Sequence, residues 1–134
     1  MPVHLSLSED RRTVSWEYQG STVTLEHDRP VRTACVFTQP PSVVVVEGWW
    51  TLPGGYGPGP RGAHFDGTSN AVVYDLDGSE RVRLAPPDLR TPIGFDQVFP
   101  ASPTDEAVFS AGTRDVHGVP DLVTGEVRHW REWR

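Results

Sequence analysis

The stretch Thr13–Glu26, TVSWEYQGSTVTLE, decides the fold class because apolar side chains recur at every second position on both sides of its Gln-Gly dipeptide. A two-residue turn at this dipeptide, residues 19–20, places the large apolar side chains of both arms on one face. The predicted cross-strand pairs are Tyr18–Ser21, Trp16–Val23 and Val14–Leu25. A shift of one residue would destroy this separation of faces. The stretch therefore predicts an antiparallel hairpin with one buried face.

A second hairpin is predicted over Ala71–Leu84, AVVYDLDGSERVRL, with Asp-Gly at 77–78 as a type I′ turn. The expected pairs are Ala71–Leu84, Val73–Val82, Tyr74–Arg81 and Asp75–Glu80. The last pair brings two like charges together, which is unfavourable unless they are solvated, bound to a cation or separated by a β-bulge.

A third hairpin is predicted over Val119–Trp133, VPDLVTGEVRHWREW, with its turn at Thr124-Gly125. Its D-x-x-T-G-x pattern resembles the outer hairpin of β-propeller blades, and the stretch Tyr74–Leu84 has a similar look. A chain of 134 residues holds two or three blades at most, whereas propellers close with about four or more. A complete propeller is therefore not expected.

Further strands are indicated between and around these hairpins. Val31–Thr38 and Ser42–Trp50 read as strands joined by Gln-Pro-Pro, and the unbroken apolar run of the second indicates a central position covered on both faces. Val3, Leu5 and Leu7 indicate an edge strand, Ala107–Ala111 indicates an interior strand, and residues 86–103 are expected to be mostly loop.

These patterns predict a single all-β domain over residues 1–134, an antiparallel meander that forms a sandwich or small barrel with little helix. Thirteen glycines and thirteen prolines at short intervals are typical of such a fold. Residues 52–62, LPGGYGPGPRG, can form neither helix nor central strand, so we expect a long loop there.

Composition limits the possible partners. The net charge of −6 repels phosphate backbones, so nucleic acid is not expected, whereas a basic protein surface is a suitable partner. All twelve basic side chains are arginine, which we attribute to a GC-rich bacterial genome. The lone Cys35 and an N-terminus without signal-peptide character indicate the cytoplasm. No apolar run approaches the roughly 20 residues needed to cross a bilayer.

Few residues indicate catalytic or cofactor chemistry. The metal-ligand candidates are His64 with Asp66 and Asp115 with His117, and no third ligand follows at a recognisable spacing. The glycines of residues 57–62 match a dinucleotide pattern but lack the helix it requires, and a chain without lysine has no P-loop. Neither a metal nor another cofactor is predicted. Cys35 is expected to be a small core residue, and His4, His27 and His129 are expected to face solvent.

Aromatic and arginine side chains are the remaining signal for binding, because Trp, Tyr and Arg are enriched at interface hot spots. The candidate binding residues are Trp49, Trp50, Tyr56, Arg61, Trp130 and Trp133. The alternative interpretation is structural: Trp16, Trp49 and Trp130 fill the core, while Trp50 and Trp133 cover sheet edges.

Three functional hypotheses follow. The first is a non-enzymatic bacterial interaction protein that binds a basic protein through an acidic, aromatic-bearing face, a profile similar by analogy to that of toxin-neutralising immunity proteins. The second is a small-molecule-binding β-barrel with residues 52–62 as its lid. The third is a metal-dependent enzyme built on the two His/Asp pairs. Exposed edge strands also make a homodimer possible.

Overall fold

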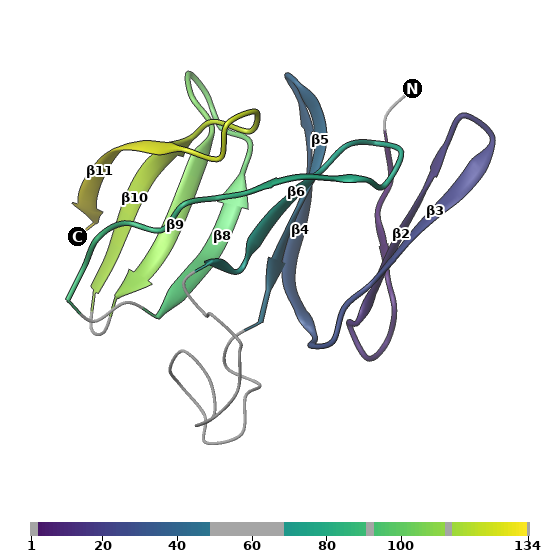
Figure 1. The fold of residues 1–134 in the computed structure, drawn as a ribbon, viewed down its shortest axis with the longest axis horizontal. Helices are drawn as coiled ribbons and strands as arrows, with labels where there is room; N and C mark the ends of the chain where they lie inside the picture. Colours follow the sequence, from purple (N-terminus) through teal and green to yellow (C-terminus); the bar gives the residue numbers. More distant parts are fainter. Residues whose placement is uncertain (1–2, 49–68, 91–92, 112–113, 134) are drawn as a thin grey trace.

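The computed structural model describes residues 3–48, 69–90, 93–111 and 114–133, and within these ranges it confirms an antiparallel all-β fold (Figure 1). The strands form three sheets in chain order. The N-terminal sheet contains β1 (Ser6–Leu7), β2 (Thr13–Tyr18) and β3 (Ser21–Glu26); the middle sheet contains β4 (Val31–Thr38), β5 (Pro41–Glu47), β6 (Ala71–Tyr74) and β7 (Glu80–Arg83); and the C-terminal sheet contains β8 (Gly94–Phe99), β9 (Glu106–Ala111), β10 (Arg114–Pro120) and β11 (Val127–Trp133).

The three sheets stack as layers, with the middle sheet between the other two (Figure 1). One apolar cluster, which includes Val14, Trp16, Val43 and Tyr74, joins the N-terminal and middle sheets. A second cluster, to which Phe109 belongs, joins the middle and C-terminal sheets. In the described residues each sheet keeps its own edges, so the strands form layers and do not close into a barrel.

Strand β5 lies inside the middle sheet and is covered on both faces, as its apolar run predicts. Val43 and Val45 belong to the cluster shared with the N-terminal sheet, and Val44 and Val46 to the cluster shared with the C-terminal sheet. All four side chains are fully buried. Because successive strand residues point to opposite faces, only an uninterrupted apolar run can serve two cores at once.

The first hairpin has the predicted register, with Trp16 opposite Val23 and Val14 opposite Leu25. Trp16 is almost completely buried, and its indole nitrogen donates a hydrogen bond to the Leu76 carbonyl at 2.9 Å. This contact fastens the N-terminal sheet to the turn of the β6–β7 hairpin.

The second hairpin follows the prediction only in part. Val73 lies opposite Val82, but a β-bulge then places Tyr74 opposite Glu80. The predicted Tyr74–Arg81 pair is therefore wrong, and Arg81 instead donates from Nε to an Asp75 carboxylate oxygen at 2.7 Å. The bulge also removes the unfavourable opposition of two carboxylates that a regular register would create.

One further expectation is refined and another is corrected. The described part of residues 86–103 is mostly loop, as predicted, but it also contains the six-residue strand β8, which pairs with β9. A bulge in β8 separates the buried Phe95 and Val98 by three positions, and this spacing hides the period-two pattern. His27 does not face solvent, since its side chain is only 4% exposed. His4 and His129 are exposed as predicted, and Cys35 is half-buried against the core, where burial raises the pKa of its thiol.

Candidate binding groove

Turns from the middle and C-terminal sheets line a groove, and these turns lie at the upper end of the molecule in Figure 1. It consists of two adjoining hollows with volumes of about 390 Å³ and about 420 Å³. Three connections form its walls: the β4–β5 turn, the β8–β9 connection and the β10–β11 hairpin. Both hollows are lined by Gln39, Thr104, Asp105, Val119 and Pro120. The groove therefore lies between turns of the middle sheet and turns of the C-terminal sheet.

Arg81 links two of the connections that line this groove. Its Nη1 atom donates to the Ser42 hydroxyl at 2.9 Å and to the Leu122 carbonyl at 3.2 Å, and Nη2 donates to the Pro41 carbonyl at 3.1 Å. Pro41 and Ser42 follow the β4–β5 turn, while Leu122 belongs to the β10–β11 hairpin. A single guanidinium group with its fixed fork of donors thus sets the spacing between two turns.

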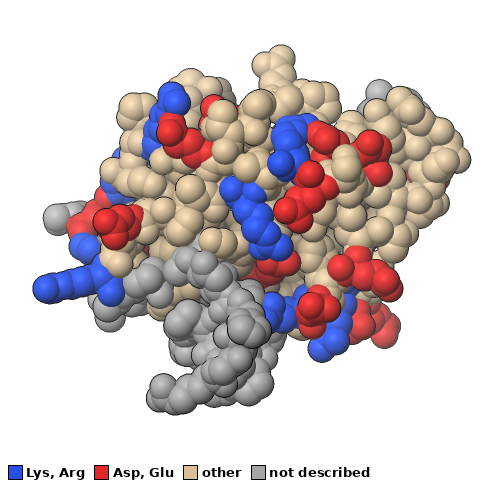
Figure 2. Space-filling view, in the orientation of Figure 1, with Lys and Arg blue, Asp and Glu red and all other residues tan. Residues whose placement is uncertain are grey.

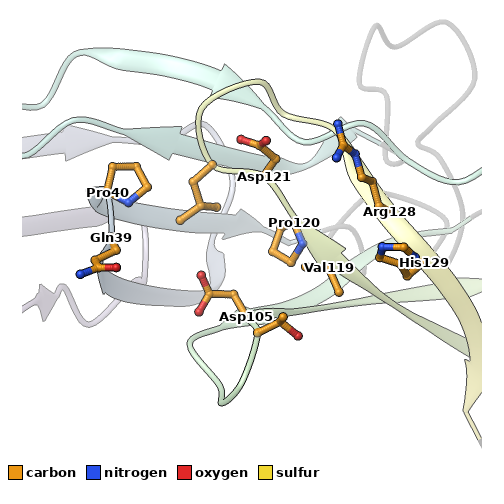
Figure 3. Close-up of a pocket in the computed structure, with 10 residues that line it drawn as sticks. Gln39, Pro40, Asp105, Val119, Pro120, Asp121, Arg128 and His129 are labelled. Carbon is orange, nitrogen blue, oxygen red and sulfur yellow. The ribbon is translucent and has the colours of Figure 1, made fainter.

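The two carboxylates that line the groove differ in their local roles (Figure 3). Asp121 accepts hydrogen bonds from the backbone amides of Val123 and Thr124 at 2.9 and 3.1 Å, and these bonds lower its pKa. It therefore stabilises its own turn, as aspartate commonly does. Burial instead raises the pKa of Asp105, and no ion pair to its carboxylate occurs among the described residues.

The remaining lining is apolar at the base and polar at the rim. Leu122 is buried, whereas Gln39 and Thr104 are exposed, and Arg128 and His129 flank the hairpin side (Figure 3). Within the part of the chain that the structure describes, no group of three or more His, Cys, Asp or Glu side chains can hold a metal ion. The groove is thus suited to non-covalent binding of a group that combines apolar surface with a positive charge or amide.

A second polar cluster lies where β3 passes into β4, at the lower end in Figure 1. His27 Nδ1 lies 3.3 Å from a Glu47 carboxylate oxygen, and Arg83 donates to the other oxygen at 2.9 Å. Burial opposes ionisation of Glu47, but these two partners outweigh it and lower its pKa. Burial and the nearby carboxylates of Glu47 and Glu80 raise the pKa of Tyr74, whose ring meets His27 edge-on, to about 12.

Asn70 connects this cluster to the C-terminal sheet. Its fully buried carboxamide donates to the backbone carbonyls of Glu47 and Phe95 at 2.8 and 2.9 Å and accepts from the Phe95 amide at 2.7 Å. These bonds satisfy backbone groups that would otherwise be buried without partners. The cluster thus has a structural role: it ties the N-terminal sheet to the middle sheet and the middle sheet to the C-terminal sheet.

Charged side chains on the visible face lie in mixed pairs rather than in patches of one sign (Figure 2). Among the described residues, ion pairs join Arg32 to Asp96 and Arg81 to Asp75. Surface pairs of this kind contribute about 0–1 kcal/mol each. Asp105 differs from these paired carboxylates in its half-buried position in a groove.

The structure places the sequence candidates in different regions. Most of them, together with the predicted loop over residues 52–62, lie outside the described residues: Trp49, Trp50, Tyr56, Arg61, His64 and Asp66. Trp130 is half-buried and packs its ring against Phe95 and Phe109, so it contributes to the core. Trp133 is the last residue of β11.

The candidate metal residues Asp115 and His117 lie on β10, and their i, i+2 spacing puts them on one face of the strand. His117 Nδ1 lies 2.8 Å from a Glu106 carboxylate oxygen, which also accepts a hydrogen bond from Arg131 at 2.6 Å. Of the two candidate metal-ligand pairs, the one that the structure describes therefore contains a histidine that already takes part in hydrogen bonds linking β9, β10 and β11.

Sequence reasoning missed the groove residues Gln39, Thr104 and Asp105. Each lies in a short turn or connection within two residues of a proline, and these connections are far apart along the chain. The only local signal was the gathering of prolines at residues 40–41 and 100–103, which indicates turns but not that the turns meet.

In comparisons with known proteins, the chain matches no family model, no curated protein and no solved structure. No helix within the described ranges has the length and apolar character required to span a membrane.

Proposed function

We propose that this protein is a non-enzymatic binding module of the bacterial cytoplasm that holds a basic segment of another protein in the turn-end groove. The observation that supports this most is Asp105, a half-buried carboxylate that lines both hollows and whose pKa burial raises. A cationic side chain that enters the groove supplies the charge partner that offsets this burial. The apolar base around Leu122 receives the aliphatic stem of that side chain.

The net charge of −6 supports the same class of partner. An acidic protein attracts a basic one over distances of about 8–10 Å at physiological salt, which raises the rate of association more than the final affinity. The hypothesis from the sequence adds a further contact region that consists of the aromatic and arginine candidates Trp49, Trp50, Tyr56 and Arg61. The similarity to immunity proteins remains an analogy of size, charge and fold class.

The proposal predicts that a library of displayed random peptides, selected on the immobilised protein, is enriched in arginine and lysine. A selected peptide should bind Asp105→Asn roughly 10- to 100-fold more weakly than the wild type, the range expected for loss of a charge-assisted hydrogen bond. Asp28→Asn is the matched control, because Asp28 is exposed and outside the groove and the substitution changes net charge equally. Fluorescence anisotropy measures both affinities.

Salt and pH sharpen this test. Association should slow steeply between low and high salt if charge steers the encounter. Because burial raises the pKa of Asp105, its carboxylate becomes protonated at a higher pH than that of an ordinary aspartate. As the pH is lowered, peptide binding should therefore begin to weaken before the pH reaches the ordinary pKa of 3.8. Equal weakening by Asp105→Asn and Asp28→Asn, or selection of peptides without basic residues, would contradict the proposal.

A further inference from the structure

His129 lies within β11 but has an unusual backbone conformation. Its φ of 59° falls in the left-handed region, which glycine adopts readily and most other residues avoid. Among the described residues, Arg11 and Gln19 are the other non-glycine residues with positive φ. Gln19 forms part of the two-residue turn of the first hairpin, and the Arg11 guanidinium group donates hydrogen bonds to two backbone carbonyls of β4, at 2.9 and 2.7 Å. Local structure therefore accounts for these two residues, whereas His129 requires a separate explanation.

A β-bulge explains why the backbone at His129 takes this conformation. The register of β10 with β11 shifts between His117 and Val119, so that His129 and Trp130 both lie opposite Gly118. The extra residue returns Trp130 to the core face, where its ring packs against the aromatic core of the C-terminal sheet. A Cβ atom on Gly118 would lie 2.9 Å from the Trp130 ring, so the indole fills the space opposite the bulge. The bulge thus serves core packing, and a glycine in place of His129 would form it without strain.

The imidazole of His129 takes no part in this packing. Hydrogen bonds hold the rings of His27 and His117, whereas neither a hydrogen bond nor an ion pair joins the ring of His129 to another described residue. The side chain is exposed and lines the groove on its β11 side, in the same hollow as Asp105 (Figure 3). Residues with strained backbones are concentrated at binding and catalytic sites. The strain at His129 therefore directs attention to what its ring contacts in the groove.

We propose that His129 determines which segment the groove accepts, through a hydrogen bond between its imidazole and the main chain of the bound partner. This role rests on the proposed function, in which a cationic side chain pairs with Asp105. Neutral imidazole offers one donor and one acceptor, and a peptide amide group offers the complementary acceptor and donor. Amide groups inside a helix are already bonded to one another. The occupant is therefore an extended basic segment, held by its cationic side chain at Asp105 and by an adjoining amide group at His129.

Replacement of His129 by glycine separates a role in binding from a role in the fold. His129→Gly keeps the bulge and relieves its strain, so the urea midpoint of unfolding should rise. A basic peptide selected on the wild type should bind this variant roughly 2- to 10-fold more weakly, the range expected for loss of one hydrogen bond. A side chain needed only for the fold would behave in the opposite way. A midpoint that does not rise, or an affinity that does not fall, would overturn the role of His129.

Gln19→Gly is the matched control for this substitution. Gln19 is exposed, has a φ of 51° and does not line the groove. Its replacement should also raise the urea midpoint, but it should leave peptide affinity unchanged. His129→Asn should restore binding, because a carboxamide offers both a donor and an acceptor and asparagine tolerates positive φ. Loss of binding in His129→Asn equal to that in His129→Gly would contradict a hydrogen bond at this position.

Alanine substitutions in the selected peptide test whether the contact is to its main chain. When the non-cationic residues are replaced one at a time, the ratio of the wild-type and His129→Gly affinities should stay constant. A ratio that falls to one for a single alanine substitution would place the contact on that side chain and contradict the proposed amide contact. Fluorescence anisotropy measures these affinities.

Failure of this role and failure of the proposed function give different results. If Asp105→Asn weakens peptide binding and His129→Gly does not, the groove holds a basic segment but His129 has no part in its recognition. If the selected peptides lack basic residues, the proposed function fails and the role of His129 fails with it.

Discussion

The β6–β7 and β10–β11 hairpins share a local pattern but differ in what covers them. Arg81, after the first turn, is 20% exposed and binds Asp75, Ser42, Pro41 and Leu122. Arg128, after the second turn, is 63% exposed and pairs with Glu126, two residues before it. The comparison teaches that the local sequence specifies the hairpin, while the neighbouring layer decides whether its arginine joins turns or stays at the surface.

Glycine substitutions give the largest expected effect in this comparison. Gly20 and Gly125 have nearly equal φ angles of 81° and 82°, but a Cβ on Gly20 meets nothing within 4 Å, whereas one on Gly125 would approach the Arg83 carbonyl oxygen to 2.6 Å. Gly20→Ala should cost about 1–2 kcal/mol from backbone strain alone. Gly125→Ala adds overpacking and should cost about 2–5 kcal/mol in total. Urea denaturation measures both free energies of unfolding, and equal losses would show that the hairpin turn does not lie on β7.

The two arginines give the next effect. Arg81→Met removes a partly buried guanidinium group and leaves several acceptors without their donor, so the free energy of unfolding should fall by about 1.5–3 kcal/mol. Arg128→Met makes the same change of charge and shape as Arg81→Met, but at an exposed side chain. Its unfolding curve should therefore overlay that of the wild type. If both variants unfold alike, Arg81 does not join the two turns as described.

The hairpins and the central strand were predictable because their signals are local. Turn dipeptides and period-two alternation set the register of β2 with β3, and the apolar run of β5 indicates a strand with two covered faces. Bulges limited the prediction elsewhere: one in β8 hides its alternation, and one beside Tyr74 shifts the partner of Arg81. Each of these bulges inserts one extra residue into a strand, and no distinctive sequence pattern marks either insertion.

The groove and the buried histidine could not be predicted, because they depend on how the layers stack. Gln39 and Asp105 line the same groove although they are distant in sequence, and no spacing rule relates the turns that carry them. His27 resembles a polar residue at the end of a strand, yet Glu47 and Tyr74 enclose it once the N-terminal sheet packs on the middle sheet. Long-range packing, not local pattern, placed these side chains.

Hydrogen–deuterium exchange of the backbone amides tests the layered arrangement most directly. If the middle sheet lies between two others, the amides of residues 43–46 in β5 should exchange most slowly, at rates set by global unfolding, while those of the short edge strand β1 exchange much faster. Exchange in β5 that is as fast as in β1 would contradict a middle sheet covered on both faces.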